Sequence, residues 1–298
     1  MTYRELYETG KSALAAAEVA EAQLDARLLL EFVCGTDRNT LLVHGDREIS
    51  PEEEARYQAF LEKRADRIPL QQLTGVQDFM GLEFCVDENV LIPRQDTEIL
   101  VEEVLRRLHD GMRVLDMCTG SGCILISLLR YSNNCTGVGA DISEKALETA
   151  RKNAERLLGV TVKNGTEATL RPDCEGFCSV KFVRGNLFEN VRGQFDVIVS
   201  NPPYIRTDVL ETLMPEVREH EPRLALDGGG DGLLFYREIL KESKGYLKKG
   251  GMLFFEIGFD QGQAVRRLLE EAGFLEIQVI KDYGGLDRVV YGTLGFEG

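Results

Sequence analysis

The sequence is poor in features that define several common classes of protein. Its 298 residues include only three histidines, His44, His109 and His220, and none is close in sequence to the motifs described below. No apolar run is long enough to span a bilayer, and the N-terminus is polar and charged, unlike a signal peptide. Lys and Arg number 35 against 50 Asp and Glu, which gives a formal net charge of −15. These deficits count against metal or histidine catalysis and membrane insertion. They also disfavour, without excluding, nucleic-acid binding, which needs a basic surface.

Cysteine is present, but its pattern does not suggest a disulfide framework. There are seven cysteines spread along the chain, and this odd number is typical of a reducing cytoplasm. Cys174 and Cys178 have a C-x3-C spacing with no second pair, so a zinc site is not expected. We therefore expect a cytoplasmic protein with no metal ion, which acts on a protein or a small molecule.

The first 73 residues have the composition of a helical region, rich in Ala and Leu. Thr2 and Glu5 have the spacing of a capping box, and Ser50-Pro51-Glu52-Glu53 is a strong helix start. Residues 1–75 contain 9 Lys and Arg against 14 Asp and Glu, so this is not a basic arm. Two interpretations remain open, a small bundle that selects a partner and a lid that covers the main domain.

Strands and helices alternate through the rest of the chain. Residues 74–95 form a bridge with a short hairpin near 79–86, and a helix follows it. From residue 112 onward the alternation predicts an α/β fold, with a parallel sheet that has helices on both faces and a closing hairpin at one edge. The expected strands are 112–117, 136–141, 180–184, 195–199, 252–257, 275–280 and 288–293. The segment 160–178 is polar and irregular, and no function follows from it.

Glycines and polar side chains follow the ends of these strands, where ligands bind in open α/β sheets. Gly120 and Gly122, after the first strand, let the backbone approach a ligand closely. A dinucleotide fingerprint would have a third glycine at the position of Leu125, so a pyrophosphate is not expected. Asp141 ends the second strand and can accept both hydroxyls of a ribose, while Asn186 follows the third and can pair with an adenine edge.

Together these features describe an adenosine without phosphates. Asp116 and its acidic surroundings would suit a cationic end on that ligand, and S-adenosyl-L-methionine has all of these properties. Each residue also has a simpler interpretation. Asp116 could satisfy backbone N–H groups in the loop, Asp141 could cap the next helix, and Asn186 could be a turn residue. Their positions at consecutive strand ends favour the cofactor.

The fourth strand, 195–199, leads into Ser200-Asn201-Pro202-Pro203-Tyr204. Two consecutive prolines cannot donate to a sheet ladder, so the strand must stop there, and Pro202 biases Asn201 away from helical geometry. The Asn201 side-chain oxygen and the Pro202 carbonyl are two acceptors that can hold both hydrogens of a planar NH2 group. Tyr204 is then placed to cover that group. A plain turn at the end of a strand is the alternative.

These residues resemble the class I S-adenosylmethionine-dependent methyltransferases that methylate planar nitrogens. A finer resemblance, which covers nearly the whole chain, is to the HemK/PrmC family of release factor glutamine-N5 methyltransferases. It rests on the helical N-terminal region and two further stretches, Ile-Pro-Arg-Gln-Asp-Thr-Glu at 92–98 and Glu-Pro-Arg-Leu-Ala-Leu-Asp-Gly-Gly-Gly-Asp-Gly at 221–232. Family members often have an acid where Asn186 stands and an aromatic residue where Leu187 stands.

The resemblance implies a Rossmann-like sheet of seven strands, mostly parallel with the last strand antiparallel, behind a small all-α domain. The implied divisions are 1–73, 74–95 and 96–298. The implied reaction is methyl transfer from S-adenosylmethionine to the N5 of the glutamine in the Gly-Gly-Gln motif of peptide chain release factors. We expect a monomer that does not bind nucleic acid directly. An N-methyltransferase that acts on an exocyclic amino group of adenine or guanine is the alternative.

The resemblance also implies the roles of individual residues. The expected cofactor contacts are Asp116, Cys118, Thr119, Gly120, Ser121, Gly122, Asp141, Ile142, Asn186, Leu187 and Asn201. The expected catalytic and substrate-binding residues are Asn201, Pro202, Pro203 and Tyr204, with Arg94 and Phe79 as further substrate contacts. No strong general base is required, because the proton that leaves the nitrogen can go to water.

Overall fold

A computed structural model describes residues 1–160, 168–169 and 179–296, and the chain divides into two compact units. The helical unit consists of Met1–Val76 and Met214–His220. The sheet unit consists of Gln77–Leu213 and Glu221–Gly298. Each unit has a hydrophobic core of its own. Cys174 and Cys178 lie outside the described residues, as does most of the polar segment that contains them.

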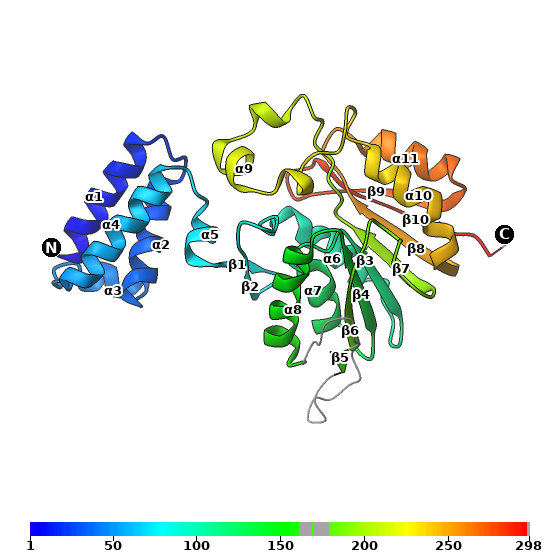
Figure 1. Cartoon of the computed structure of the whole chain (residues 1–298), viewed down its shortest axis with the longest axis horizontal. Helices are drawn as coiled ribbons and strands as arrows, with labels where there is room; N and C mark the ends of the chain where they lie inside the picture. The colour runs from blue at the N-terminus through cyan, green and yellow to red at the C-terminus, as the bar shows by residue number, and fades with distance from the viewer. Residues whose placement is uncertain (161–167, 170–178, 297–298) are drawn as a thin grey trace. The chain divides into compact units, whose positions relative to one another are not determined.

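The helical unit confirms the helical character predicted for the N-terminal region (Figure 1). Its helices are α1 (Tyr3–Ala16), α2 (Ala22–Cys34), α3 (Arg38–Val43), α4 (Pro51–Ala65), α5 (Leu70–Thr74) and α9 (Pro215–His220). Both predicted helix starts are present, because Thr2 with Glu5 and Ser50 with Glu53 form complete capping boxes. The core is closed by Tyr57, whose hydroxyl donates to the Ala26 carbonyl at 3.0 Å.

Helix α9 joins this unit through buried ion pairs, although it comes from far along the chain. The carboxylate of Glu216 accepts from Arg64 Nη2 at 2.9 Å and from both Nε and Nη2 of Arg67, at 2.8 and 2.6 Å. Arg64 also donates from Nε to Asp25 at 2.7 Å. Burial acts to raise the pKa of Glu216, but the hydrogen bonds from Arg67 and Arg64 outweigh it and lower the pKa to about 2.

The sheet unit contains the predicted parallel sheet. Within the described residues the strand order is β5-β6-β4-β3-β7-β8-β10-β9. The strands are β3 (Arg113–Met117), β4 (Thr136–Asp141), β5 (Ala168–Thr169), β6 (Ser179–Arg184), β7 (Phe195–Ser200), β8 (Leu247–Glu256), β9 (Phe274–Lys281) and β10 (Asp287–Leu294). The last strand, β10, runs antiparallel to both of its neighbours, as expected. The two-residue strand β5 is an addition at the opposite edge, antiparallel to β6.

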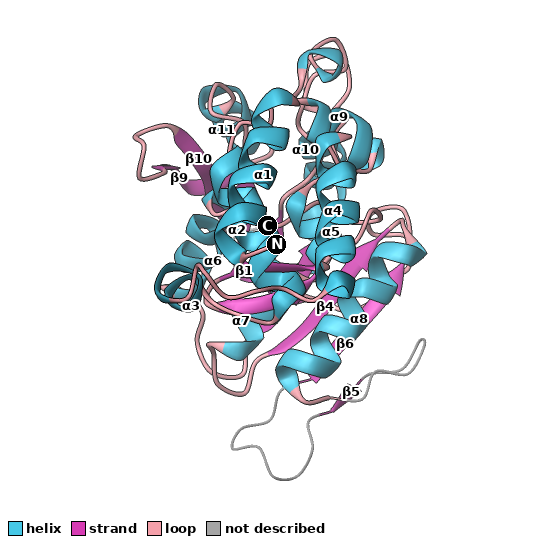
Figure 2. Cartoon of the chain, turned by 90° about the vertical axis from the view of Figure 1, so that its left-hand side faces the viewer, coloured by secondary structure: helices cyan, strands magenta, loops and turns pink. Residues whose placement is uncertain are grey.

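Two helical layers cover the sheet. Helices α6 (Asp96–Leu105), α7 (Cys123–Arg130) and α8 (Glu144–Leu158) share one core with alternate residues of the strands, such as Val114. Helices α10 (Leu234–Tyr246) and α11 (Gly262–Glu271) share the other core, with Leu115. Figure 1 shows these two groups on opposite sides of the sheet, and Figure 2 shows α8 lying across the strands beside β6. The period-two alternation along β3 therefore directs side chains into both layers.

The bridge between the two regions contains the expected hairpin. Strands β1 (Val76–Phe79) and β2 (Leu82–Cys85) form a separate two-stranded sheet, and Met80 and Gly81 at its turn both have positive φ. Short 3-10 helices at Leu210–Thr212 and Arg223–Ala225 flank α9. Among the described residues, no helix is both long enough and apolar enough to cross a membrane.

Replacement of Glu216 by Ala tests the buried ion pairs of the helical unit. Loss of this carboxylate leaves Arg64 and Arg67 without their shared partner, so Glu216→Ala should lower the free energy of unfolding by about 3 kcal/mol at pH 7. The difference between Glu216→Ala and the parent chain should shrink as the pH falls below about 4, because the low folded-state pKa stabilises the fold only while the carboxylate is ionised.

The measurement is urea unfolding followed by circular dichroism. Glu219→Ala is the matched control, because Glu219 lies on the same helix in an exposed pair with Arg218, and it should leave the unfolding curve nearly unchanged. Equal effects of the two substitutions would show that the buried pairs do not stabilise the unit.

Candidate active site

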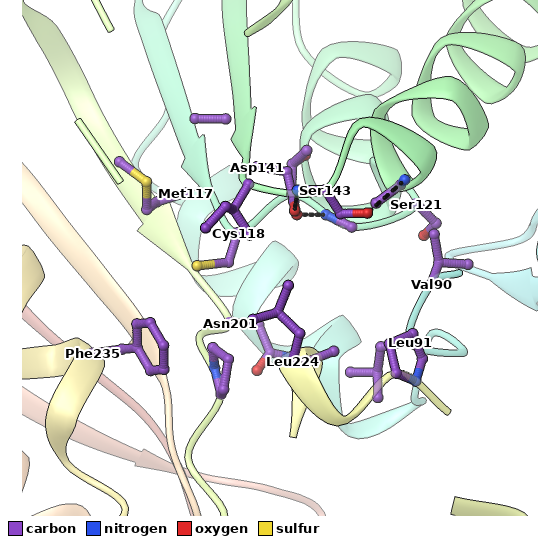
Figure 3. A pocket seen from close by; sticks show the side chains of 18 of the residues that line it. Val90, Leu91, Met117, Cys118, Ser121, Asp141, Ser143, Asn201, Leu224 and Phe235 are labelled. Carbon is purple, nitrogen blue, oxygen red and sulfur yellow. Dashed lines mark hydrogen bonds between the residues drawn. The ribbon is translucent and has the colours of Figure 1, made fainter. Parts of the chain in front are cut away.

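A cavity of about 420 Å³ opens in the sheet unit at the carboxyl ends of β3, β4, β6 and β7. This is the edge of the sheet at which the sequence places its glycine turn and its Asn-Pro-Pro-Tyr motif. The predicted site residues that line the cavity are Arg94, Cys118, Thr119, Gly120, Ser121, Asp141, Ile142, Asn186, Leu187, Asn201 and Pro203. Figure 3 shows Cys118, Asp141 and Asn201 around the same hollow.

The turn after β3 adopts a conformation that strongly favours glycine. Cys118, Gly120 and Gly122 have φ values of 62°, 56° and 79°, so three of five consecutive residues are left-handed. A Cβ on Gly122 would also lie 2.9 Å from Ile126 Cδ1 and 3.2 Å from Ala150 Cβ. Gly122 therefore lets the turn pack against α7 and α8. The sequence predicts that Gly122 contacts the cofactor, but this residue does not line the cavity.

Asp141 at the end of β4 holds the glycine turn in place. Its Oδ2 accepts from the Gly120 N–H at 2.9 Å, and its Oδ1 accepts from the Ser143 N–H at 2.9 Å (Figure 3). Burial raises the pKa of Asp141, and these backbone hydrogen bonds act against the rise. A carboxylate has about four lone-pair sites, so Asp141 can still accept from the hydroxyls of a ligand.

Asp116 has a different position from the one expected. It is fully buried behind the turn, does not line the cavity, and accepts from the Thr119 hydroxyl at 2.5 Å. Within the described part of the chain its other oxygen, Oδ1, has no hydrogen-bond partner. Burial raises the pKa of Asp116 to about 7. This acid supports the turn and can act on a ligand through its charge, but not by direct contact.

Asn201 lies in the cavity wall where β7 ends. Its Nδ2 donates to the Thr97 hydroxyl oxygen at 3.4 Å, which leaves its Oδ1 for a ligand. Pro203 lines the cavity, whereas Pro202, which the sequence also assigns to the site, does not, and both prolines are buried. The polar acceptor predicted at this strand end is therefore in place.

The sequence predicts that Tyr204 covers the bound group, but Tyr204 is not among the residues that line the cavity. Its hydroxyl donates to Glu256 Oε1 at 3.3 Å, and its own carbonyl accepts from Gln261 Nε2 at 3.0 Å. Burial raises the pKa of the Tyr204 phenol. The side chain points toward the buried acid at the end of β8, because that carboxyl offers the hydroxyl a partner.

The Asp227–Gly232 loop packs directly on the Asn-Pro-Pro-Tyr backbone. The Ile205 N–H donates to the Leu226 carbonyl at 3.0 Å, and the Gly228 N–H donates to the Ile205 carbonyl at 2.7 Å. A Cβ on Gly228 would lie 2.7 Å from Tyr204 Cα. The glycine at 228 is therefore required by the close approach of two backbone segments.

Comparison with known proteins agrees with this arrangement. Residues 5–75 match the PrmC N-terminal domain, and residues 94–231 match the Methyltransferase small domain. The release factor glutamine methyltransferase of Geobacter sulfurreducens is 42% identical over 295 residues, which cover 99% of this chain and 97% of that protein. The chain belongs to the release factor glutamine methyltransferase family.

Two further relatives extend the comparison. The release factor glutamine methyltransferase of Agrobacterium fabrum is 41% identical and covers 93% of this chain and 92% of its own. A methyltransferase from Pyrococcus furiosus of known structure has 18% identity and a TM-score of 0.50, and covers 81% of this chain and 99% of that one. The likeness to the Pyrococcus furiosus protein concerns the fold alone.

Arg94 reaches the cavity together with a segment that the family resemblance singled out. Its Nη2 donates to Glu221 Oε1 at 2.5 Å, while the Glu221 side chain is 1% exposed. Pro222, Leu224 and Ala225 follow in the cavity wall. Phe79, in contrast, is 1% exposed and packs edge-to-face on Phe84 in the hydrophobic core. The prediction that Phe79 contacts the substrate is wrong, because its ring is enclosed by apolar neighbours and does not line the cavity.

Sequence reasoning missed several residues of the release factor methyltransferase site. Thr97 lines the cavity, as do the apolar residues Val90, Leu91 and Phe235. Glu256 lies in a predicted strand with no predicted role, although an acid at the end of a buried strand is a usable signal. It does not line the cavity but bonds to Tyr204. Among the described residues, no cluster of His, Cys, Asp or Glu could hold a metal ion.

Substitution of Gly228 tests the packing of the loop on the motif. Gly228→Ala should lower the free energy of unfolding by about 1–3 kcal/mol, because the new Cβ meets backbone atoms that cannot move aside cheaply. Gly230→Ala is the control in the same loop, since a Cβ there meets nothing within 4 Å and its φ is not left-handed. Urea unfolding of both variants is the measurement, and equal stabilities would contradict the proposed close approach.

Proposed function

We propose that this chain transfers a methyl group from S-adenosyl-L-methionine to the side-chain N5 of the glutamine in the Gly-Gly-Gln motif of peptide chain release factors. The observation that carries the proposal is Asn201, whose side chain lies in the cavity wall with its nitrogen engaged by Thr97. Its free oxygen matches the hydrogens of a primary amide. Membership of the family supports a release factor as the protein that presents that amide.

The cavity residues fit S-adenosylmethionine. Asp141 retains acceptor capacity for ribose hydroxyls, and the backbone from Cys118 to Ser121 forms the adjoining wall. Leu91 and Leu187 give apolar surface for an adenine ring, with the Asn186 amide beside it. We assign these residues to the cofactor, together with the other cavity-lining residues of the glycine turn and Ile142. Gly122 and Asp116 act on it indirectly, by shaping the turn.

The chain promotes the reaction by holding the amide. S-adenosylmethionine, when bound, supplies a methyl group on a positively charged sulfur. An amide nitrogen is a poor nucleophile, because its lone pair is delocalised into the carbonyl. The Asn201 Oδ1 and the Pro202 carbonyl accept the two amide hydrogens, which favours lone-pair density on the nitrogen and fixes its direction. With the cofactor in place, an N–C bond would form as the S–C bond breaks, and the nitrogen would then lose one proton to water. Positioning of this kind can supply roughly 7–11 kcal/mol of the barrier.

The helical unit is assigned to recognition of the release factor. Its match to the PrmC N-terminal domain supports this role. The net charge of −15 favours a protein substrate over a nucleic acid. In this proposal the enzyme works as a cytoplasmic monomer and does not bind nucleic acid directly.

The substrate assignment is tested by transfer of a radioactive methyl group from S-adenosylmethionine. The protein is incubated in parallel with a release factor, with the same factor carrying Gln→Ala in its Gly-Gly-Gln motif, and with duplex DNA. Label should enter the intact release factor alone. Label on DNA would instead assign the enzyme to a nucleic-acid base, and equal label on the Gln→Ala factor would place the modification on another residue.

Two variants separate the roles of the cavity residues. Asn201→Ala should reduce methyl transfer by about 100-fold or more, because the amide loses its positioning, while the Kd for S-adenosylmethionine changes little. Asp141→Ala should raise that Kd by about tenfold or more, because ribose loses its acceptor. Isothermal titration calorimetry gives the Kd, and loss of cofactor binding in Asn201→Ala would assign that residue a structural role.

A further inference from the structure

Thr97 is a buried hydroxyl group in the cavity wall that the proposed reaction does not use. It lies in the first turn of α6 and is 2% exposed. Its Oγ1 accepts from Asn201 Nδ2 at 3.4 Å. This contact joins a side chain of α6 to the residue that ends β7, so it links two elements that are far apart in the sequence.

The contact decides which end of the Asn201 carboxamide faces the cavity. A carboxamide has an acceptor oxygen at one end and an NH2 donor at the other. With Nδ2 held by Thr97, Oδ1 is left for the hydrogens of an incoming amide. With the group turned over, two NH2 groups would face each other and neither could accept. The correct orientation therefore depends on Thr97 acting as an acceptor.

A buried acid on the strand beside β7 is an acceptor for a hydroxyl proton. Glu256 ends β8, the strand beside β7, where Ser200 is in register with Phe255. Its carboxyl is 1% exposed, and within the described part of the chain its Oε2 has no hydrogen-bond partner. The Thr97 hydroxyl favours the ionised form of this carboxyl. A Thr97 hydroxyl that donates its proton to this carboxyl keeps its lone pairs for Asn201.

We propose that Thr97 is a positioning residue that fixes the orientation of the Asn201 carboxamide, with Glu256 as the acceptor that sets the direction of the Thr97 hydroxyl. This inference rests on the proposed function and adds the part of the site that holds Asn201 ready. Tyr204, whose hydroxyl donates to Glu256 Oε1 at 3.3 Å, belongs to the same group of residues.

The proposal has a consequence for pH. When Glu256 is protonated, its proton can be donated to Thr97, whose hydroxyl then points toward Asn201 and favours the wrong end of the carboxamide. Burial raises the pKa of Glu256 to about 7, while Thr97, Arg288 and Tyr204 act to lower it and Asp96 acts to raise it. Two further groups face this residue from the helical layers, Tyr236, which donates to its backbone carbonyl, and Cys123. The kcat should therefore fall as the pH drops through about 7.

The first test compares Thr97→Val with Thr97→Ser. The valine has the same shape without a hydroxyl, so kcat for methylation of a release factor should fall about tenfold, with KM for the factor and Kd for S-adenosylmethionine nearly unchanged. The serine should restore most of the rate. Ser243→Ala is the control, because it removes a buried hydroxyl whose hydrogen bond stays within α10, and it should leave kcat unchanged.

A second measurement reads the orientation of Asn201 without catalysis. The side-chain NH2 of Asn201 is identified by NMR as the signal that Asn201→Ala removes. In the parent chain one of its protons should exchange slowly with solvent, and Thr97→Val should abolish that protection while Thr97→Ser keeps it. This measurement decides the inference even if the parent enzyme does not methylate a release factor, which would overturn the proposed function alone.

A third measurement tests the part assigned to Glu256. The decline of kcat below about pH 7 should be present in the parent enzyme and absent in Glu256→Gln. Full activity of Thr97→Val alongside an active parent would overturn the positioning role of Thr97. Identical pH profiles for the parent and Glu256→Gln would overturn the role of Glu256.

Discussion

The stop that two prolines impose on β7 is the constraint from which the site follows. Neither Pro202 nor Pro203 has an N–H for the sheet ladder, so the chain must leave the sheet at Ser200. The chain is held in place again just after the motif, because the Gly228 N–H donates to the Ile205 carbonyl at 2.7 Å. Asn201 is therefore held by a strand before it and by a paired loop after it. Such a turn loses little conformational freedom when a substrate binds, which is what positioning catalysis requires.

The second constraint is electrostatic. Three carboxyl groups in this region, Asp116, Glu221 and Glu256, are buried, and each has an oxygen with no hydrogen-bond partner in the described part of the chain. Burial raises the pKa of all three. Arg94 offsets part of this cost at Glu221, and Thr119 does so at Asp116. Buried acids with an unsatisfied oxygen are costly for a fold and gather at functional sites, where their field favours a positively charged ligand.

Local signals predicted the parts of the structure that depend on neighbouring residues. The capping boxes at Thr2 and Ser50 were visible because a cap and its partner are three residues apart. The strand ends were visible because an apolar run is followed by a turn residue, and parallel strands bring those ends to one edge of the sheet. Residues such as Asp141 and Asn201 could therefore be placed at one cavity without knowledge of the strand order.

What the sequence could not indicate was the direction of individual side chains. Tyr204 turns to Glu256 because β8 lies beside β7, and that adjacency is a property of the sheet order. Thr97 meets Asn201 across a separation of 104 residues. Helix α9 packs in the helical unit because Glu216 finds two arginines there, and nothing near it in the sequence points to them.

The buried acids of the two units make stability respond to pH in opposite directions. Glu216 has a lowered folded-state pKa, so its contribution is complete above about pH 4.5 and is lost as the pH falls toward 2. Asp116 and Glu256 have folded-state pKa values of about 7, so between about pH 4 and 7 the folded chain holds protons that the unfolded chain has released. Their contribution to stability therefore falls as the pH rises through that window. A cationic ligand in the cavity favours the ionised form of Asp116, so its binding strengthens over the same range in which this acid weakens the fold without the ligand.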